Sequence, residues 1–122
     1  MTYVEGFVVP VPTANREAYR DMARVVGQVF IDNGALEVIE AWGDDVPPGH
    51  TTDFQRAVAL GPDETVVFSL VLWPSREVRD RNHKAMVDDP RFEALPRDIF
   101  DGRRMIHGGF ATLLDLRKGE PA

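Results

Sequence analysis

Residues 65–73, T-V-V-F-S-L-V-L-W, carry the strongest strand signal in the chain. β-Branched and aromatic side chains dominate the stretch, and both kinds favour extended structure. A strand with one solvated face alternates between apolar and polar residues, and this one does not. Its apolar side chains fall on both faces, Val66, Phe68, Leu70 and Leu72 on one and Val67, Val71 and Trp73 on the other. Both faces of the predicted strand therefore need apolar cover.

Two strands and a helix are predicted before this stretch. Residues 3–11 and 36–42 are rich in β-branched and aromatic residues, and the first run ends in prolines. Between them, apolar residues recur at steps of three and four, which predicts a helix over 14–32. Thr13 or Asn15 is expected to cap that helix, because a short side-chain oxygen can accept from its free N–H groups.

A helix and a strand are predicted after it. Ser75 is expected to cap a helix that ends near residues 88–89, where the following proline disfavours helical geometry. The last strand is predicted over 104–116, and its Gly108-Gly109 pair indicates a bulge or a close approach by another backbone. Residues 54–60 fit either a short helix or an alternating strand, so that segment stays open.

The order strand-helix-strand, repeated twice, predicts a ferredoxin-like α+β fold, βαββαβ, with a four-stranded antiparallel sheet. Residues 1–117 are expected to form one domain, followed by a polar tail at 118–122. Two helices can cover only one face of such a sheet. The other face would then expose a large apolar patch, so we expect a homodimer in which a second sheet covers it.

Composition excludes several classes of protein. The 122 residues include no cysteine, which rules out disulfides, thiolate metal sites and a cysteine nucleophile and is compatible with a cytoplasmic location. Fourteen Lys and Arg against twenty Asp and Glu give a net charge of −6, which disfavours binding to nucleic acid. No apolar run is long enough for a membrane span, so no membrane partner is expected.

His107 is the candidate catalytic residue, because an imidazole transfers protons near neutral pH. Trp42 and Trp73 end two strands, where an indole can wall a pocket and donate its N–H. Arg103 could hold a carboxylate, and Tyr3 completes the candidate ligand-binding set. Each of these residues can equally serve packing, the dimer contact or, for the arginine, a surface ion pair.

No metal or cofactor site is expected. Asp44, Asp45, His50 and Asp53 lie close together in sequence, but a Val-Pro-Pro run breaks the alternate spacing of a calcium loop. Such aspartates more often accept hydrogen bonds from their own turn. The chain contains neither a glycine-rich phosphate loop nor a nucleophile elbow.

Several segments resemble the uncharacterised YbaA-like family of bacterial proteins. They are Y-V-E-G-F-V-V-P-V-P at the start, A-W-G-D-D-V-P-P-G at 41–49, T-D-F-Q-R-A-V at 52–58, E-T-V-V-F-S at 64–69 and F-D-G-R-R-M-I-H-G-G-F at 100–110. The likeness implies membership of the dimeric α+β barrel group. That group includes cofactor-independent oxygenases, isomerases, haem-degrading enzymes and ligand-binding proteins, so it implies a pocket without naming a reaction.

Three hypotheses for the function follow. The first is a small-molecule pocket between sheet and helices, in a protein that resembles a cofactor-free oxygenase or isomerase. The second is a non-catalytic structural or interaction module without a ligand. RNA binding is the third, and would require a local basic patch.

Overall fold

The computed structural model describes residues 1–120, so residues 121–122 of the predicted tail lie outside it. The strands are β1 (Tyr3–Pro12), β2 (Glu37–Trp42), β3 (Glu64–Trp73) and β4 (Ile106–Ala111). The helices are the 3-10 turn η1 (Thr13–Asn15), α1 (Arg16–Asp32), α2 (Phe54–Ala57), α3 (Arg76–Val87) and α4 (Pro90–Glu93). The segment 54–60, left open by the sequence, therefore begins with one helical turn.

The four strands form one antiparallel sheet in the order β2-β3-β1-β4. Every residue of β3 pairs with one of β1, from Tyr3 opposite Trp73 to Pro12 opposite Glu64. On its other side β3 pairs with β2. The predicted ferredoxin-like sheet is confirmed, with the strand of residues 65–73 at its centre.

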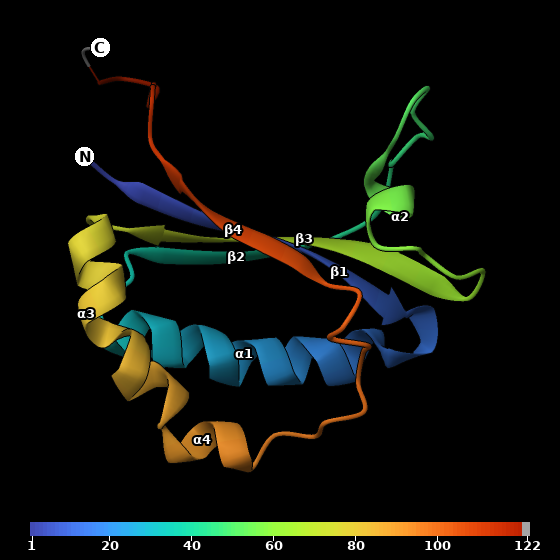
Figure 1. Cartoon of the computed structure of the whole chain (residues 1–122), viewed down its shortest axis with the longest axis horizontal. Helices are drawn as coiled ribbons and strands as arrows, with labels where there is room; N and C mark the ends of the chain where they lie inside the picture. The colour runs from blue at the N-terminus through green and yellow to red at the C-terminus, as the bar shows by residue number, and fades with distance from the viewer. Residues whose placement is uncertain (121–122) are drawn as a thin grey trace.

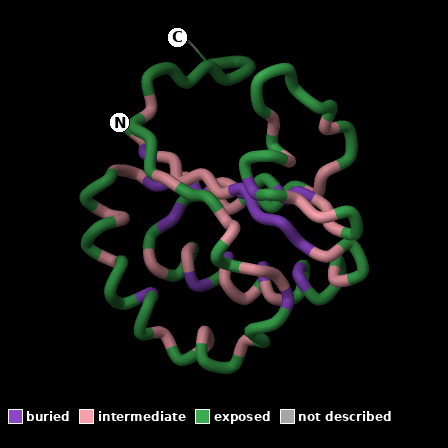
Figure 2. The backbone as a smooth tube through the Cα atoms, turned by 45° about the vertical axis from the view of Figure 1, so that its right-hand side comes forward, coloured by how far each residue is buried: buried purple, intermediate pink, exposed green. Residues whose placement is uncertain are grey.

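Helices α1, α3 and α4 lie on one side of the sheet (Figure 1). Buried residues concentrate along the sheet and the adjoining side of α1, whereas the excursions above the sheet are exposed (Figure 2). The core on the helix side contains Val67, Val71 and Trp73 of β3. Within residues 1–120 no helix is long and apolar enough to cross a membrane.

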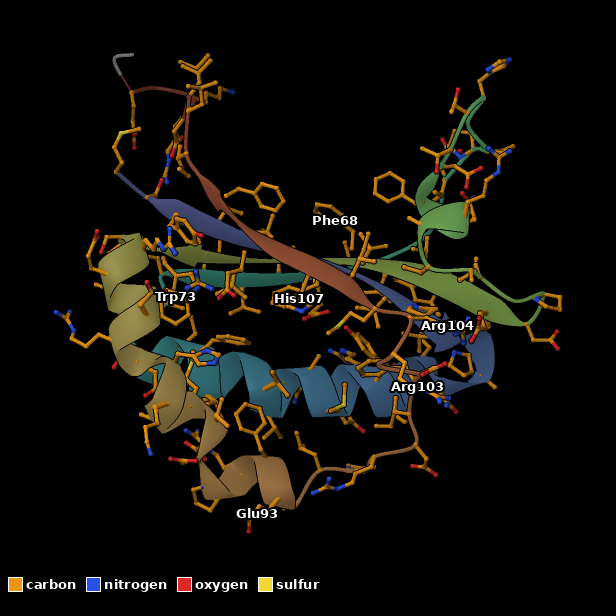
Figure 3. The ribbon with its side chains drawn as sticks, viewed as in Figure 1. Phe68, Trp73, Glu93, Arg103, Arg104 and His107 are labelled. Atoms are coloured by element: carbon orange, nitrogen blue, oxygen red, sulfur yellow. The ribbon has the colours of Figure 1, made fainter. Side chains whose placement is uncertain are left out.

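The opposite face of the sheet, here called the open face, is apolar and only partly covered. Its central side chain is Phe68, which points away from the helix layer and is 45% exposed (Figure 3). The register places these further residues on the same face: Val4, Ile39, Leu70, Leu72, Ile106 and Phe110. The prediction that β3 is apolar on both sides is confirmed.

Two excursions of the chain rise above the open face, one at each end (Figure 1). Residues 43–60, here called the arm, contain α2 and pack Val46, Val58 and Leu60 on one end of the sheet. Phe54 of the arm meets Phe68 edge-on at 6.2 Å. The C-terminal segment leaves the other end of the sheet. Between arm and segment the apolar side chains of the open face remain uncovered.

The helix caps were predicted in part. Ser75 caps α3 as expected, with its Oγ accepting from the N–H of Val78 at 3.2 Å. Neither Thr13 nor Asn15 caps α1, so that prediction was wrong. Asn15 instead donates its side-chain amide to the carbonyl of Ile99 at 2.9 Å, and a 3-10 turn precedes the helix. A long-range contact has replaced the local one.

The last strand is shorter than predicted, because its partner ends. The sequence indicated 104–116, but β4 covers only Ile106–Ala111. Ala111 pairs with Tyr3, the first residue of β1, and one further bond joins the N–H of Thr112 to the carbonyl of Thr2. Within residues 1–120, no strand is available to pair with the chain beyond that point. Three leucines that were predicted to lie in the strand are therefore exposed: Leu113, Leu114 and Leu116.

Arg104 lies two residues before the start of β4, and its side chain joins three segments. Its guanidinium donates to both carboxylate oxygens of Glu64 at 2.7 and 2.6 Å, to Asp101 at 3.0 Å and to the carbonyl of Ala59 at 2.9 Å. Hydrogen bonds from Arg104 and from the Gly61 N–H hold the pKa of Glu64 below its ordinary value. This contact fixes the start of β3 against the turn before β4.

The register of β4 with β1 is continuous through Gly108 and Gly109, so the predicted bulge is absent. Gly109 does mark a close approach, but by a side chain. A Cβ at Gly109 would lie 2.7 Å from ring carbons of Tyr3 and against its hydroxyl. Tyr3 cannot easily move, because Arg79 lies 5.1 Å over its ring and donates to its hydroxyl at 3.2 Å.

We predict that Gly109→Ala destabilises the fold by about 1–3 kcal/mol, since an extra carbon in a filled space costs that much. Gly108→Ala is the matched control. Its Cβ would meet Phe110 at 3.5 Å, which is an ordinary contact. Urea unfolding of both variants measures the difference, and equal losses would show that the Tyr3 contact does not constrain Gly109.

Candidate functional site

A groove lies beside the sheet, between α1 and the edge strand β2. Its volume is about 540 Å³. Helix α1 forms one wall, Val38, Glu40 and Trp42 of β2 form the other, and Val67 of β3 lies at the bottom. We call this space the α1–β2 groove.

Small residues on α1 create the space. Tyr19, Ala23 and Gly27 follow each other at steps of four and form the buried row of the helix that faces the sheet. A Cβ on Gly27 would lie 3.4 Å from a methyl group of Val38. Glycine in the middle of a helix costs about 1 kcal/mol relative to alanine. Gly27 therefore lets α1 approach Val38 of β2 closely, at a cost to the stability of the helix.

Glu40 is the polar centre of the groove. Its two carboxylate oxygens accept separate hydrogen bonds, from the Tyr19 hydroxyl at 2.7 Å and from the Ser69 hydroxyl at 2.8 Å. Both donors are buried, whereas Glu40 is exposed on an edge strand and lines the groove. Each oxygen keeps acceptor capacity for a further donor. The carboxylate is thus held in place with its free side open to a ligand.

Tyr19 acts as a hydrogen-bond donor in this pair. Burial raises the pKa of the Tyr19 phenol well above its ordinary value, and the adjacent Glu40 carboxylate adds to the shift. The phenol therefore stays protonated at neutral pH. Its ring is also held in the core, meeting Phe100 edge-on at 5.9 Å. The donor is fixed by packing, and it fixes Glu40 in turn.

Only one of the candidate residues from the sequence lies in this groove. Trp42 lines it, half-buried, and the guanidinium of Arg16 lies 5.8 Å over its ring. Such a distance allows a cation–π contact. Trp42 can therefore touch a ligand with the part of its ring that the arginine leaves free.

Tyr3 and Trp73 lie together, but in the core beneath the sheet and away from the groove. Trp73 is fully buried and donates its indole N–H to Glu5 at 2.8 Å. Arg79 of α3 contacts the same carboxylate at 3.3 Å and the Tyr3 hydroxyl at 3.2 Å. These contacts occupy the groups that were expected to meet a ligand. Their ligand-binding role stays a prediction.

His107 lies on the helix side of the sheet, at the edge opposite the groove (Figure 3). The register aligns Glu40, Ser69, Phe7 and His107 in one row across all four strands. Three strand spacings of about 4.8 Å put His107 roughly 14 Å from Glu40. Its ring is exposed and stacks on Phe7 at 6.0 Å. A catalytic role for His107 stays a prediction, and one separate from the groove.

Arg103 is an exposed residue of the turn before β4. Its side chain is 93% exposed and pairs with Asp101 at 3.3 Å. The neighbouring Arg104 makes the ordered contact described above. The structure thus separates the two arginines of the D-G-R-R motif into a surface residue and a packing residue.

Asp53, considered for a metal loop, has a local role. Its carboxylate accepts from the Arg56 N–H at 2.7 Å, which caps α2, and from the Gly49 N–H at 3.1 Å. These bonds hold the pKa of Asp53 below its ordinary value. Within residues 1–120 no group of three or more His, Asp or Glu side chains is arranged to hold a metal ion.

Sequence reasoning missed Glu40, and it took Tyr19 only as part of an apolar helix stripe. One signal was present in each element. Val38, Glu40 and Trp42 share one face of β2, so the glutamate stands between two apolar neighbours. On the helix, Ala23 and Gly27 are the smallest residues of the buried row. A polar side chain among apolar residues that line a cleft is typical of a ligand site.

Comparison with known proteins identifies relatives along nearly the whole chain. Residues 2–102 match the model of the family DUF1428, described as a protein of unknown function. The chain is 47% identical over 116 residues to the uncharacterized protein YbaA of Escherichia coli K12, covering 94% of this chain and 99% of YbaA. YbaA of Shigella flexneri matches to the same extent.

Solved structures share the fold at low identity. A mutant of SnoaB, a cofactor-independent oxygenase from Streptomyces nogalater, gives a TM-score of 0.60 at 16% identity over 94% of this chain and 96% of its own. A dimeric ferredoxin-like protein from an uncultured marine organism gives 0.59 at 10% identity over 95% and 100%. At this identity the likeness establishes only the fold, and it confirms the ferredoxin-like class. By the family model and the YbaA match together, the chain belongs to the DUF1428 family of proteins of unknown function.

Proposed function

We propose that this protein is a homodimer that binds a small molecule in the α1–β2 groove of each subunit. The groove itself carries the proposal. Its volume of about 540 Å³ falls within the 300–1,000 Å³ or so that is usual for small-molecule sites. Its apolar residues, which include Ala23, Val38 and Val67, can contact the body of a ligand, and a fixed, accessible carboxylate can orient it.

The open face supports the homodimer. Its exposed side chains include Phe68, Ile106 and Phe110, the last of them 61% exposed. Monomers seldom leave so many apolar side chains together in water. A structural neighbour is described as a dimeric ferredoxin-like protein, which is consistent with this arrangement.

The C-terminal segment supports it as well. Leu113 is 94% exposed, and Leu114 and Leu116 are also uncovered. The segment rises above the open face at the end opposite the arm (Figure 1). A second sheet seated between arm and segment would bury these leucines together with Phe68. The proposed interface thus uses all the apolar groups that one chain leaves exposed on this side.

Substitution of Phe68 tests the interface. Phe68→Glu would bury a charge at the centre of the dimer, and we expect its dissociation constant to rise by about 100-fold or more. Val87→Glu places the same charge on α3, at a side chain that is 61% exposed and lies off the open face, and should leave the dimer intact. Sedimentation at several protein concentrations measures both, and a wild-type monomer would refute the proposal.

A fragment screen tests the groove. Amide spectra should show that some neutral or charged fragments shift the signals of Ala23, Gly27 and Val38. Ala23→Leu fills the groove and should abolish those shifts. Gly27→Ala is the milder variant, which narrows the groove while favouring the helix by about 0.5–1 kcal/mol. If no fragment of any charge shifts these amides, the groove is not a binding site.

Proton transfer is the second candidate function, and Glu40 carries it. Its carboxylate lies in the groove where a substrate C–H could reach it, as an isomerase or a cofactor-free oxygenase would require. The Tyr19 and Ser69 hydroxyls each donate to one of its oxygens and so hold the carboxylate in a fixed position. In D₂O, a bound ligand with an acidic C–H should therefore gain deuterium at that carbon. Glu40→Gln should stop the exchange, whereas exchange that persists in this variant would exclude Glu40 as the base.

A non-catalytic module remains the alternative if neither binding nor exchange is found. His107 is then a surface residue stacked on Phe7. The cytoplasmic location expected from the sequence stays a prediction.

A further inference from the structure

Three arginines form the outer rim of the α1–β2 groove. Arg16, Arg20 and Arg24 follow each other at steps of four on α1 and line the groove beside its buried row. A step of four residues advances about 6 Å along the helix axis, so the three arginines follow one another along the same edge of the helix. All three residues are exposed.

None of the three arginines forms an ion pair or a side-chain hydrogen bond within residues 1–120. Other arginines of the chain do, among them Arg79, Arg91 and Arg104. The chain carries a net charge of −6, so carboxylates are abundant elsewhere on it. The rim therefore retains free basic groups in an acidic protein, next to an apolar cavity.

The acidic groups of the groove do not neutralise the rim. Its lining contains two carboxylates, those of Glu17 and Glu40. Glu40 accepts from the hydroxyls of Tyr19 and Ser69 at the bottom of the groove, and it makes no ion pair with an arginine of α1. The groove thus offers a ligand both a hydrogen-bond acceptor, the Glu40 carboxylate, and hydrogen-bond donors, the guanidinium groups of the rim.

The three arginines are not equivalent. Arg16 lies over Trp42, and that contact holds it at the end of the groove. Arg20 and Arg24 have no such aromatic contact within residues 1–120, and they line the groove next to Ala23 and Gly27 in the helix. A guanidinium binds carboxylate or phosphate oxygens in a planar, two-pronged contact. Arg20 and Arg24 are placed to share one such anion.

We propose that the ligand of this groove is an organic anion whose apolar body lies against Ala23, Gly27 and Val38 and whose carboxylate or phosphate group binds Arg20 and Arg24. The inference rests on the proposed function, since it names the ligand class of the same groove. A hydroxyl or amide group on the ligand could donate to Glu40, but the anion provides the selectivity. Neutral and cationic molecules of equal size should bind more weakly.

Four probes of one chain length test the charge preference: octanoate, octyl phosphate, octan-1-ol and octylammonium. Titrations followed by the amide signals of Ala23 and Gly27 give the affinities. We expect both anions to bind at least tenfold more tightly than the alcohol, and the ammonium ion not to bind. Added salt should weaken the anions alone. The ratio of octanoate to octyl phosphate shows which anionic group the rim prefers.

Charge-removing variants test the residues. Arg20→Gln and Arg24→Gln should each weaken octanoate by about tenfold, as expected for loss of a charged hydrogen bond. Arg81→Gln is the matched control, because Arg81 is an exposed helical arginine without an ion pair within residues 1–120 and lies outside the groove. It should leave the affinity unchanged. All of these changes are at exposed positions, so thermal unfolding should confirm intact folds.

The outcomes separate this inference from the proposed function. If octan-1-ol binds as tightly as octanoate and Ala23→Leu blocks both, the groove binds ligands but the anion preference is refuted. The same holds if octanoate binds and neither glutamine variant weakens it. If none of the probes and no screened fragment shifts the groove amides, both the inference and the proposed function fail.

Discussion

The apolar character of β3 on both faces is the constraint on which the rest of the structure depends. Val67, Val71 and Trp73 are covered by the helix layer, and this produces the core. Phe68 on the opposite face has no comparable cover within the chain. Apolar area removed from water contributes about 25 cal/mol per Å², so leaving this face wet forfeits a large stabilisation. The apolar side chains of this one strand thus account for the helix layer, and they are the reason for proposing a second subunit.

Most of the fold could be predicted because its signals are local or periodic. The apolar period of α1, the extended stretches and the Ser75 cap all depend on residues close in sequence. The predictions that were wrong concern residues whose structure depends on segments far away in the sequence. Residues 112–116 look like a strand, yet β1 begins at Tyr3 and offers them no partner. Asn15 looks like a cap, yet the carbonyl of Ile99 takes its amide.

The candidate site was harder to predict, because a groove is defined by what is missing. Trp42 was found from its place at a strand end. The antiparallel register of β2 and β3 brings Glu40 to Ser69, and the packing of α1 on the sheet brings Tyr19 to Glu40. No sequence motif indicates that the small residues Ala23 and Gly27 line a groove. Tyr3 and Trp73, in contrast, were predicted to bind a ligand, but their polar groups form hydrogen bonds in the core with Arg79 and Glu5.

Strand β2 links the two halves of the proposal. Alternate side chains point to opposite faces, so Ile39 lies on the open face while its neighbours Val38 and Glu40 wall the groove. Among residues 1–120, the backbone of this edge strand pairs with no strand other than β3. A partner sheet packed on Ile39 would hold β2 from its other side and so fix the position of Glu40. Contacts of the partner on the open face would thus help to hold Glu40 in the position that a ligand in the groove needs.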